Sequence, residues 1–148
     1  MAILHSLPVS SGNRTIARVD LARRVLGCET YSIANLYPEP LPNVNGIGRS
    51  DEAIWVRGRS EIERQLSRGD CSDVLLGYGV QEPVGAARQP FRDQLRWLQG
   101  ELSASSARVW VFGGRPTHPS RWQRVAHRHA PGGGVDALAA VLLAPYSL

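Results

Sequence analysis

The sequence is read most easily from one stretch, Arg108-Val-Trp-Val-Phe-Gly-Gly-Arg-Pro-Thr-His-Pro-Ser-Arg-Trp122. Its first half is β-branched and aromatic, which predicts a strand that ends at the glycine pair. Its second half holds His118 between two prolines, which fix φ and withhold N–H groups, so we expect a stiff loop and not a helical turn. A histidine held rigidly at the carboxyl end of a strand lies where open α/β sheets bind ligands. The alternative is a turn in which His118 only caps a neighbouring group.

Upstream of this stretch, short apolar runs alternate with helical patterns. Strands are expected at 2–7, 30–36, 71–80 and 108–112, and helices at 13–26, 51–69 and 90–102. Asn13 is the expected N-cap of the first helix and Gly27 its C-terminal stop. Gly58 weakens the middle of the second helix, so the part after Ser60 is favoured. The alternation predicts an α/β fold, namely a three-layer sandwich with a four-stranded parallel sheet and helices on both faces.

The last 18 residues, which begin with a glycine-rich break, do not follow this pattern. We expect one α/β domain over 1–130, then a break at Pro131-Gly-Gly-Gly134 and a short apolar tail. The tail segment 136–143 suits a short helix or strand that docks back or pairs with another copy. The expected state is therefore a monomer or a weak homodimer.

The composition is that of a soluble globular chain. Of the 148 residues, 43% are hydrophobic and 20% are charged, which is enough apolar material for one core. No apolar run approaches 20 residues, so no membrane span is expected, and the start does not resemble a signal peptide. Cys28 and Cys71 are too few for a disulfide framework and are interpreted as core or near-core thiols of a cytoplasmic protein.

The charge of the chain is carried by arginine. All 17 basic residues are arginine, none is lysine, and the net charge is +4. This balance allows a phosphate-rich partner without requiring one. The chain holds no H-E-x-x-H or C-x-x-C pattern, and its glycine runs lack the spacing of a nucleotide-binding loop. We therefore expect no metal site and no cofactor.

In a parallel sheet, the loops after the strands meet along one rim, and polar residues gather in these loops. Asn35 suits the reading of a nucleobase edge, or alternatively caps the adjacent loop. His118 suits donation to a carbonyl oxygen on which charge develops. Arginines here suit phosphate, although most arginines simply face solvent. The expected ligand-binding residues are Arg14, Thr15, Asn35, Tyr37, Gly77, Arg115, Ser120 and Arg121.

Four segments carry a resemblance to a known family. They are Asn13-Arg-Thr-Ile-Ala-Arg18, Ser32-Ile-Ala-Asn-Leu-Tyr37, Asp73-Val-Leu-Leu-Gly-Tyr-Gly79 and Arg115-Pro-Thr-His-Pro-Ser120. Together they resemble domain-of-unknown-function family 1643, an uncharacterised bacterial and phage family, over nearly everything up to about residue 124. This resemblance implies no established activity.

A more distant resemblance is to the uracil-DNA glycosylase superfamily. Asn35 matches its base-reading position, and His118-Pro119-Ser120 matches its H-P-S loop. The resemblance implies a doubly wound parallel sheet, recognition of a base edge by Asn35, and stabilisation of the departing base's oxygen by His118. Leu7-Pro8 stands where an Asn-Pro or Asp-Pro pair positions water, and Asn13, the remaining candidate for that catalytic role, comes a few residues late. Trp122 is the candidate for a residue that wedges into a nucleic acid.

Three functions follow from these observations. The first is a glycosylase-like enzyme that hydrolyses an N-glycosidic bond in a nucleic acid or nucleoside, with DNA chemistry requiring base flipping. The second is a non-catalytic module that binds a nucleobase, nucleotide or nucleic acid at the same rim, which the missing water-positioning residue favours. The third is an interaction protein that dimerises through its tail.

Overall fold

The computed structural model describes residues 1–8, 12–41, 52–68 and 71–148. Its elements are, in chain order, β1 (Ala2–Leu7), α1 (Asn13–Val25), β2 (Ile33–Pro40), α2 (Glu52–Leu66), β3 (Asp73–Gly77), the 3-10 turn η2 (Gly85–Ala87), α3 (Arg88–Ala104), β4 (Arg108–Phe112), the 3-10 turn η3 (Pro119–Arg121), α4 (Trp122–His129), α5 (Val135–Leu142) and β5 (Leu143–Pro145). The alternation of strands and helices through β4 confirms the predicted α/β class.

The sheet has one strand more than predicted. Its order is β2-β1-β3-β4-β5. The first four strands are parallel to one another, whereas β5 runs antiparallel to β4, with Trp110 opposite Pro145. The extra strand comes from the apolar tail, which docks back onto the sheet and adds to its β4 edge.

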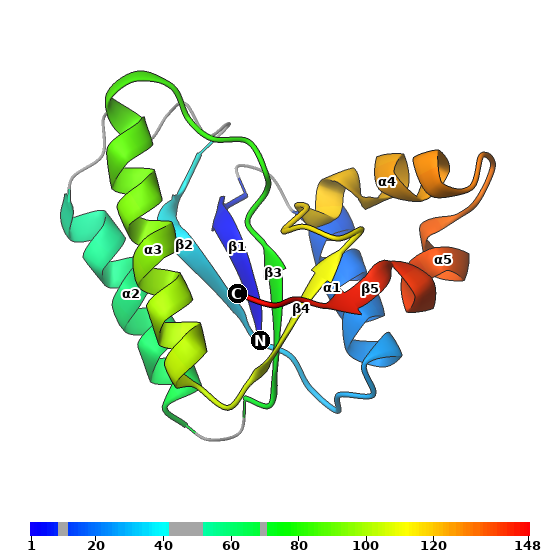
Figure 1. Ribbon diagram of the computed structural model, residues 1–148, viewed down its shortest axis with the longest axis horizontal. Helices are drawn as coiled ribbons and strands as arrows, with labels where there is room; N and C mark the ends of the chain where they lie inside the picture. Colours follow the sequence, from blue (N-terminus) through cyan, green and yellow to red (C-terminus); the bar gives the residue numbers. More distant parts are fainter. Residues whose placement is uncertain (9–11, 42–51, 69–70) are drawn as a thin grey trace.

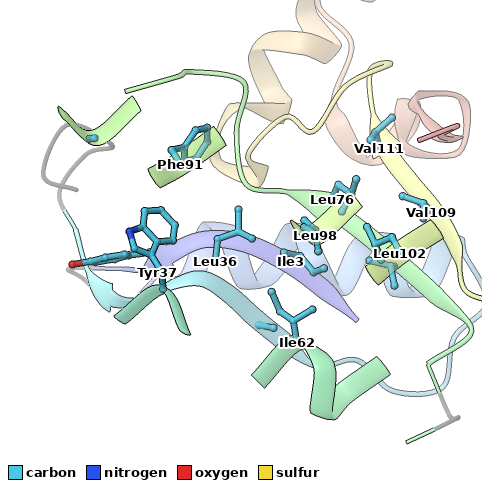
Figure 2. Close-up of a cluster of buried hydrophobic side chains, with 14 residues drawn as sticks. Ile3, Leu36, Tyr37, Ile62, Leu76, Phe91, Leu98, Leu102, Val109 and Val111 are labelled. Carbon is cyan, nitrogen blue, oxygen red and sulfur yellow. The ribbon is translucent and has the colours of Figure 1, made fainter. Parts of the chain in front are cut away.

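Helices cover both faces of the sheet (Figure 1). On one face, α2 and α3 enclose a cluster that includes Ile62, Phe91 and Leu98, and Figure 2 shows these side chains against residues of the strands such as Leu36. On the other face, α1, α4 and α5 enclose a second cluster around Phe112 and Trp122. This arrangement is three-layered, as the sequence predicts, because each strand buries side chains on both of its faces.

The second strand begins and ends later than predicted. It runs from Ile33 through Pro38 to Pro40, whereas the sequence indicates a proline-rich excursion from Tyr37. The part of that excursion over 42–46 lies outside the described residues. Prolines are tolerated here because β2 is an edge strand, and its free side needs no ladder hydrogen bonds.

The second helix is continuous, and Gly58 is the reason that it lies close to the sheet. A β-carbon at Gly58 would collide with the backbone carbonyl oxygen of Leu36 and come within 3.0 Å of that of Asn35. Gln94 of α3 ties the same region together, because its Nε2 donates to the carbonyl oxygens of Leu36 at 3.0 Å and Trp55 at 3.3 Å. Contacts with α2 and α3 therefore hold β2, the strand that carries Asn35, in place.

The C-terminal tail belongs to the second core cluster. Val135, Ala139 and Leu142 are buried there against α1 and α4. Two backbone hydrogen bonds connect this region to β4 and the residue after it, from Gly113 to Leu142 and from Tyr146 to Val109, each of 2.8 Å. The two cysteines, in contrast, are half-buried free thiols.

Candidate functional site

A cleft opens at the carboxyl edge of the sheet, where β3 and β4 end while β1 and β2 continue. In the sheet, Leu4 of β1 lies beside Asn35 of β2 and beside Gly77, the last residue of β3. Beyond this level β1 and β2 stay paired as far as Leu7 and Pro40. Next to the carboxyl ends of β3 and β4 lies a cleft of about 1220 Å³. It is lined by the end of β1, the start of α1 and the loops after β3 and β4. Parallel α/β sheets bind ligands at this edge.

The cleft wall is strongly basic. Five arginines line it, and none of the described residues that line it is Asp or Glu: Arg14, Arg115, Arg121, Arg124 and Arg128. Nine other arginines of the described chain pair with carboxylates, but these five form no ion pair with any described residue. Unpaired guanidinium groups around a concavity attract and bind anions.

The basic surface continues beyond the cleft. An adjoining groove of about 690 Å³ shares Arg14, Arg121 and Arg124 with it and adds Gln123 and His127. Arg121, Arg124 and Arg128 follow each other at i, i+3 and i+7, which places them along one side of α4 and the turn before it. The helix therefore presents a row of positive charges and not a single one.

Apolar side chains line the same cleft. Leu7, Ile16 and Val80 line it and are 40%, 43% and 56% exposed. Large exposed apolar residues beside cationic ones suit a ligand with a flat apolar part and an anionic part.

His118 is held in one ring orientation by its own turn. Its Nδ1 lies 2.8 Å from Ser120 Oγ and accepts from the backbone N–H of Ser120 at 3.3 Å. Because a backbone N–H only donates, Nδ1 acts as an acceptor, and the proton of the neutral ring is on Nε2. Burial, together with the charge of Arg121, lowers the pKa of His118, so the ring is neutral at pH 7. His118 is thus a neutral donor through Nε2–H.

Asn35 and His5 contribute buried polar groups to the cleft lining. The sequence places Asn35 at the end of its strand, but it is the third residue of β2. It still lines the cleft, because it is level with Gly77, where β3 ends on the other side of β1. Its Oδ1 is buried without a hydrogen-bond partner among the described residues, and so is Nε2 of His5. Burial and the nearby His118 lower the pKa of His5 to about 4.

The first helix starts one residue earlier than the sequence indicates. Gly12, in the left-handed conformation with φ of 63°, is the N-cap, so Asn13 is the first helical residue and not the cap. Asn13, Arg14 and Thr15 all line the cleft. The first turn of a helix has backbone N–H groups without intrahelical partners, which adds donors to this wall.

Three residues expected at the rim lie elsewhere. Tyr37 is buried in the core, edge-on to Trp55 with ring centroids 5.2 Å apart. Gly77 does not line the cleft; a β-carbon there would come within 3.1 Å of Leu4 and of Pro119, so it allows the loop to pack on β1. Trp122 is fully buried and stacked on Phe112 at 4.1 Å, which overturns its expected role as a wedge.

The loop after β4 is also more helical than predicted. Pro119 begins the 3-10 turn η3, and α4 follows at once. Proline suits the first helical position because its fixed φ is already helical and no N–H is required there. Arg115, His118, Ser120 and Arg121 line the cleft as expected of this loop.

Part of the lining is not among the residues predicted from the sequence. Arg124 and Arg128 are two such residues, although their spacing from Arg121 is a signal once α4 is recognised. His5 is a titratable residue within the short strand Ala2–Leu7, directly after Ala2, Ile3 and Leu4, which is a second usable signal. Tyr78, whose pKa burial raises to about 12, lines the cleft as a neutral phenol, and nothing in its sequence context marks it.

Comparison with known proteins adds no relative. No protein-family model, no curated protein and no solved structure matches the chain. Among the described residues, no group of three or more His, Cys, Asp or Glu side chains is placed to hold a metal ion. None of the helices described is long and apolar enough to cross a membrane.

Proposed function

We propose that this protein is uracil-DNA-glycosylase-like and binds a nucleobase that carries phosphate, as a nucleotide or within a nucleic acid, in the cleft at the carboxyl ends of its strands. The observation that carries the proposal is the set of five arginines that form no ion pair with a described residue, in a cleft whose described lining holds no carboxylate. No carboxylate of the described lining neutralises this wall, so an external anion is bound at little cost in broken ion pairs. The strand order β2-β1-β3-β4 supports the doubly wound sheet that the resemblance implies.

The other cleft residues suit the base. Leu7, Ile16 and Val80 offer apolar surface for the faces of a planar ring. Asn35 and His118 offer hydrogen-bond donors for its polar edge. In Asn35 the buried atom is Oδ1 and not the amide nitrogen, and His118 carries its proton on Nε2. A ligand with a flat ring, carbonyl oxygens and phosphate uses all three kinds of surface.

Hydrolysis of the N-glycosidic bond is the second candidate function at this site, and the state of His118 favours it. When the bond between the sugar carbon and the base nitrogen breaks, the base leaves with the electron pair, and a rigid neutral donor stabilises the charge on its oxygen. Water then adds to the sugar carbon, and its proton passes to the departed base, so the products are the free base and a sugar hydroxyl. Asn13 is the described side chain in the cleft that we assign to the orientation of that water, since Leu7 cannot accept a hydrogen bond from it.

The binding proposal is tested by titration at two salt concentrations. The ligands are a nucleoside, its monophosphate, a short single-stranded oligonucleotide and a duplex. The proteins are the wild type, an Arg121→Ala/Arg124→Ala double variant and an Arg24→Ala/Arg96→Ala control, in which two exposed arginines that pair with Asp20 and Asp93 outside the cleft are lost instead. Both variants change the net charge equally, so a difference between them reports position and not total charge.

We expect the cleft variant to lose at least tenfold in affinity for the phosphate-bearing ligands and to show a shallower salt dependence, because fewer counterions are released. The nucleoside should be affected little. Steeper salt dependence for the oligonucleotide than for the monophosphate would assign the adjoining groove to a polynucleotide backbone. If the wild type binds none of these ligands, or if the two variants bind them equally, the proposal is wrong.

A further inference from the structure

Two buried side-chain atoms in the described part of the chain lack a hydrogen-bond partner, and both belong to residues of the same cleft. They are Nε2 of His5 and Oδ1 of Asn35. Unsatisfied buried polar atoms are uncommon in folded proteins, and their presence together calls for a reason other than packing. Asn35 already has a role in the proposed function, whereas His5 does not.

His5 is kept in place by apolar contact and not by hydrogen bonds. It is only 8% exposed, and its ring lies 5.9 Å from the ring of Phe91. Neither ring nitrogen forms a hydrogen bond with a described residue. Of the two ring nitrogens, only Nε2 is fully buried, so Nδ1 is the nitrogen that a ligand in the cleft can contact. A structural histidine in a core normally satisfies at least one of its nitrogens, which this one does not.

The position of the proton follows from this geometry. Burial and His118 keep the imidazole neutral at pH 7, since the pKa of His5 is lowered to about 4. A neutral ring carries one N–H. If that N–H were Nε2–H, a donor would be buried with no acceptor, which is costlier than a bare lone pair. The proton therefore belongs on Nδ1, where it faces the cleft.

We propose that His5 is a specificity-determining residue of the cleft, whose Nδ1–H donates to a carbonyl oxygen of the bound base and so favours carbonyl-bearing bases over amino-bearing ones. The inference rests on the proposed function and deepens it by naming the ligand class. An amino group of the base at the same place would face Nδ1–H with a second donor, so neither N–H group would have an acceptor. Uridine and cytidine nucleotides, and inosine and adenosine nucleotides, differ in this group.

The test uses His5→Phe and His5→Gln with these two nucleotide pairs. Phenylalanine keeps a ring against Phe91 but has no donor, whereas glutamine keeps an N–H. We expect the wild type to bind the carbonyl-bearing member of each pair about tenfold more tightly, the value of one good hydrogen bond. His5→Phe should abolish this preference and leave the affinity for the amino-bearing member nearly unchanged, and His5→Gln should restore part of it.

Stability of the free protein separates this role from a structural one. Because His5 makes no hydrogen bond with a described residue, His5→Phe should unfold at the same temperature as the wild type or higher at pH 7. A structural histidine would instead lower that temperature on replacement. Lower stability of His5→Phe, or an unchanged preference in it, would overturn the inference.

The two proposals fail in different ways. If the arginine double variant loses affinity as expected but His5→Phe discriminates like the wild type, only the role of His5 is wrong. Equal wild-type affinity for both members of each pair likewise refutes only the role of His5. If the wild type binds no nucleotide at all, the proposed function is wrong and the role of His5 is refuted with it.

Discussion

His118 is the residue whose replacement best separates an enzyme from a binding module. Its Nε2–H is aimed by the contacts of Nδ1 with Ser120, and such a donor gains most value as charge develops on the departing base. We expect His118→Ala to lower turnover about 100-fold or more with little change in ground-state affinity, as on loss of one oxyanion donor. Release of base from uracil-containing, thymine-mismatch and nucleoside substrates measures this effect.

Asn35→Ala is the matched comparison for His118→Ala, because a base edge is read before and during the reaction. It should mainly weaken binding. If the protein only binds, both substitutions lower affinity, and the wild type releases no base from any substrate. That outcome would assign the chain to the non-catalytic module, with Leu7 at the water-positioning place as the physical reason.

His5 also makes stability depend on pH. Its pKa is about 4 in the fold against 6.5 in the unfolded chain, so the unfolded state binds the extra proton between these values. Stability is therefore complete above pH 6.5 and falls as the pH drops toward 4, by about 3 kcal/mol for this group. The lowered pKa of His118 acts in the same direction.

Denaturant unfolding of the wild type and of His5→Phe between pH 7 and pH 4.5 checks this prediction. The wild type should lose stability more steeply than the variant, and the difference between the two curves isolates His5 from the carboxylates, which titrate at lower pH. Parallel curves would mean that His5 is not buried in its neutral form.

At the scale of elements, the contact of α2 with β2 depends on Gly58. Alanine is intrinsically the better helix former by about 1 kcal/mol, yet a β-carbon at this position collides with the backbone of Leu36. We expect Gly58→Ala to lower the free energy of unfolding by about 1–3 kcal/mol, the usual cost of overpacking. It should also weaken ligand binding, because β2 carries Asn35.

Gly100 offers the control for this substitution. It lies in the interior of α3, and a β-carbon there would meet nothing within 4 Å. Gly100→Ala should therefore raise the free energy of unfolding by about 0.5–1 kcal/mol. Chemical denaturation of the two variants beside the wild type gives both values, and destabilisation of the same size in both would refute a specific role of Gly58.

The same elements show how far sequence reasoning reaches. Local patterns predict β1 and β4 at their observed bounds, because apolar runs and glycine stops are local signals. The course of β2 through Pro38 and the continuity of α2 across Gly58 depend on tertiary context, namely an edge position and a close helix–strand approach. Local propensity accounts for the cost of Pro38 in a strand and of Gly58 in a helix. It does not account for the tertiary contacts that offset this cost.

At the scale of the whole molecule, the sequence does not predict which arginines gather on one surface. Seventeen arginines and a net charge of +4 indicate an anionic partner only in general terms. The fold decides which arginines pair with carboxylates and which five gather at the cleft without a carboxylate partner in the described part of the chain. The rim position of His118 was predictable because strand ends meet in a parallel sheet. Tyr37 was misplaced because β2 continues past it to Pro40, so that it lies within the strand and in the core.

The C-terminal tail is the part of the molecule whose role differs most between sequence and structure. As a separate segment after residue 130 it would be dispensable for folding, but here it supplies β5 and the buried residues Val135, Leu142 and Leu143. Three such side chains stabilise a fold by about 1.5–3 kcal/mol each, a sum that approaches the total stability of a small domain. A chain ending at Ala130 should therefore fail to fold cooperatively.

Circular dichroism melting and sedimentation of three proteins test this expectation. A chain lacking only Ser147 and Leu148, which are exposed, should melt like the full chain, whereas the chain ending at Ala130 should show no cooperative transition. Val141→Asp is the third protein, since Val141 is 65% exposed on α5 and its replacement spares the core. If the chain ending at Ala130 melts normally, the tail is not needed for the fold. If Val141→Asp converts a dimer to a monomer, the exposed face of α5 also acts between copies of the chain.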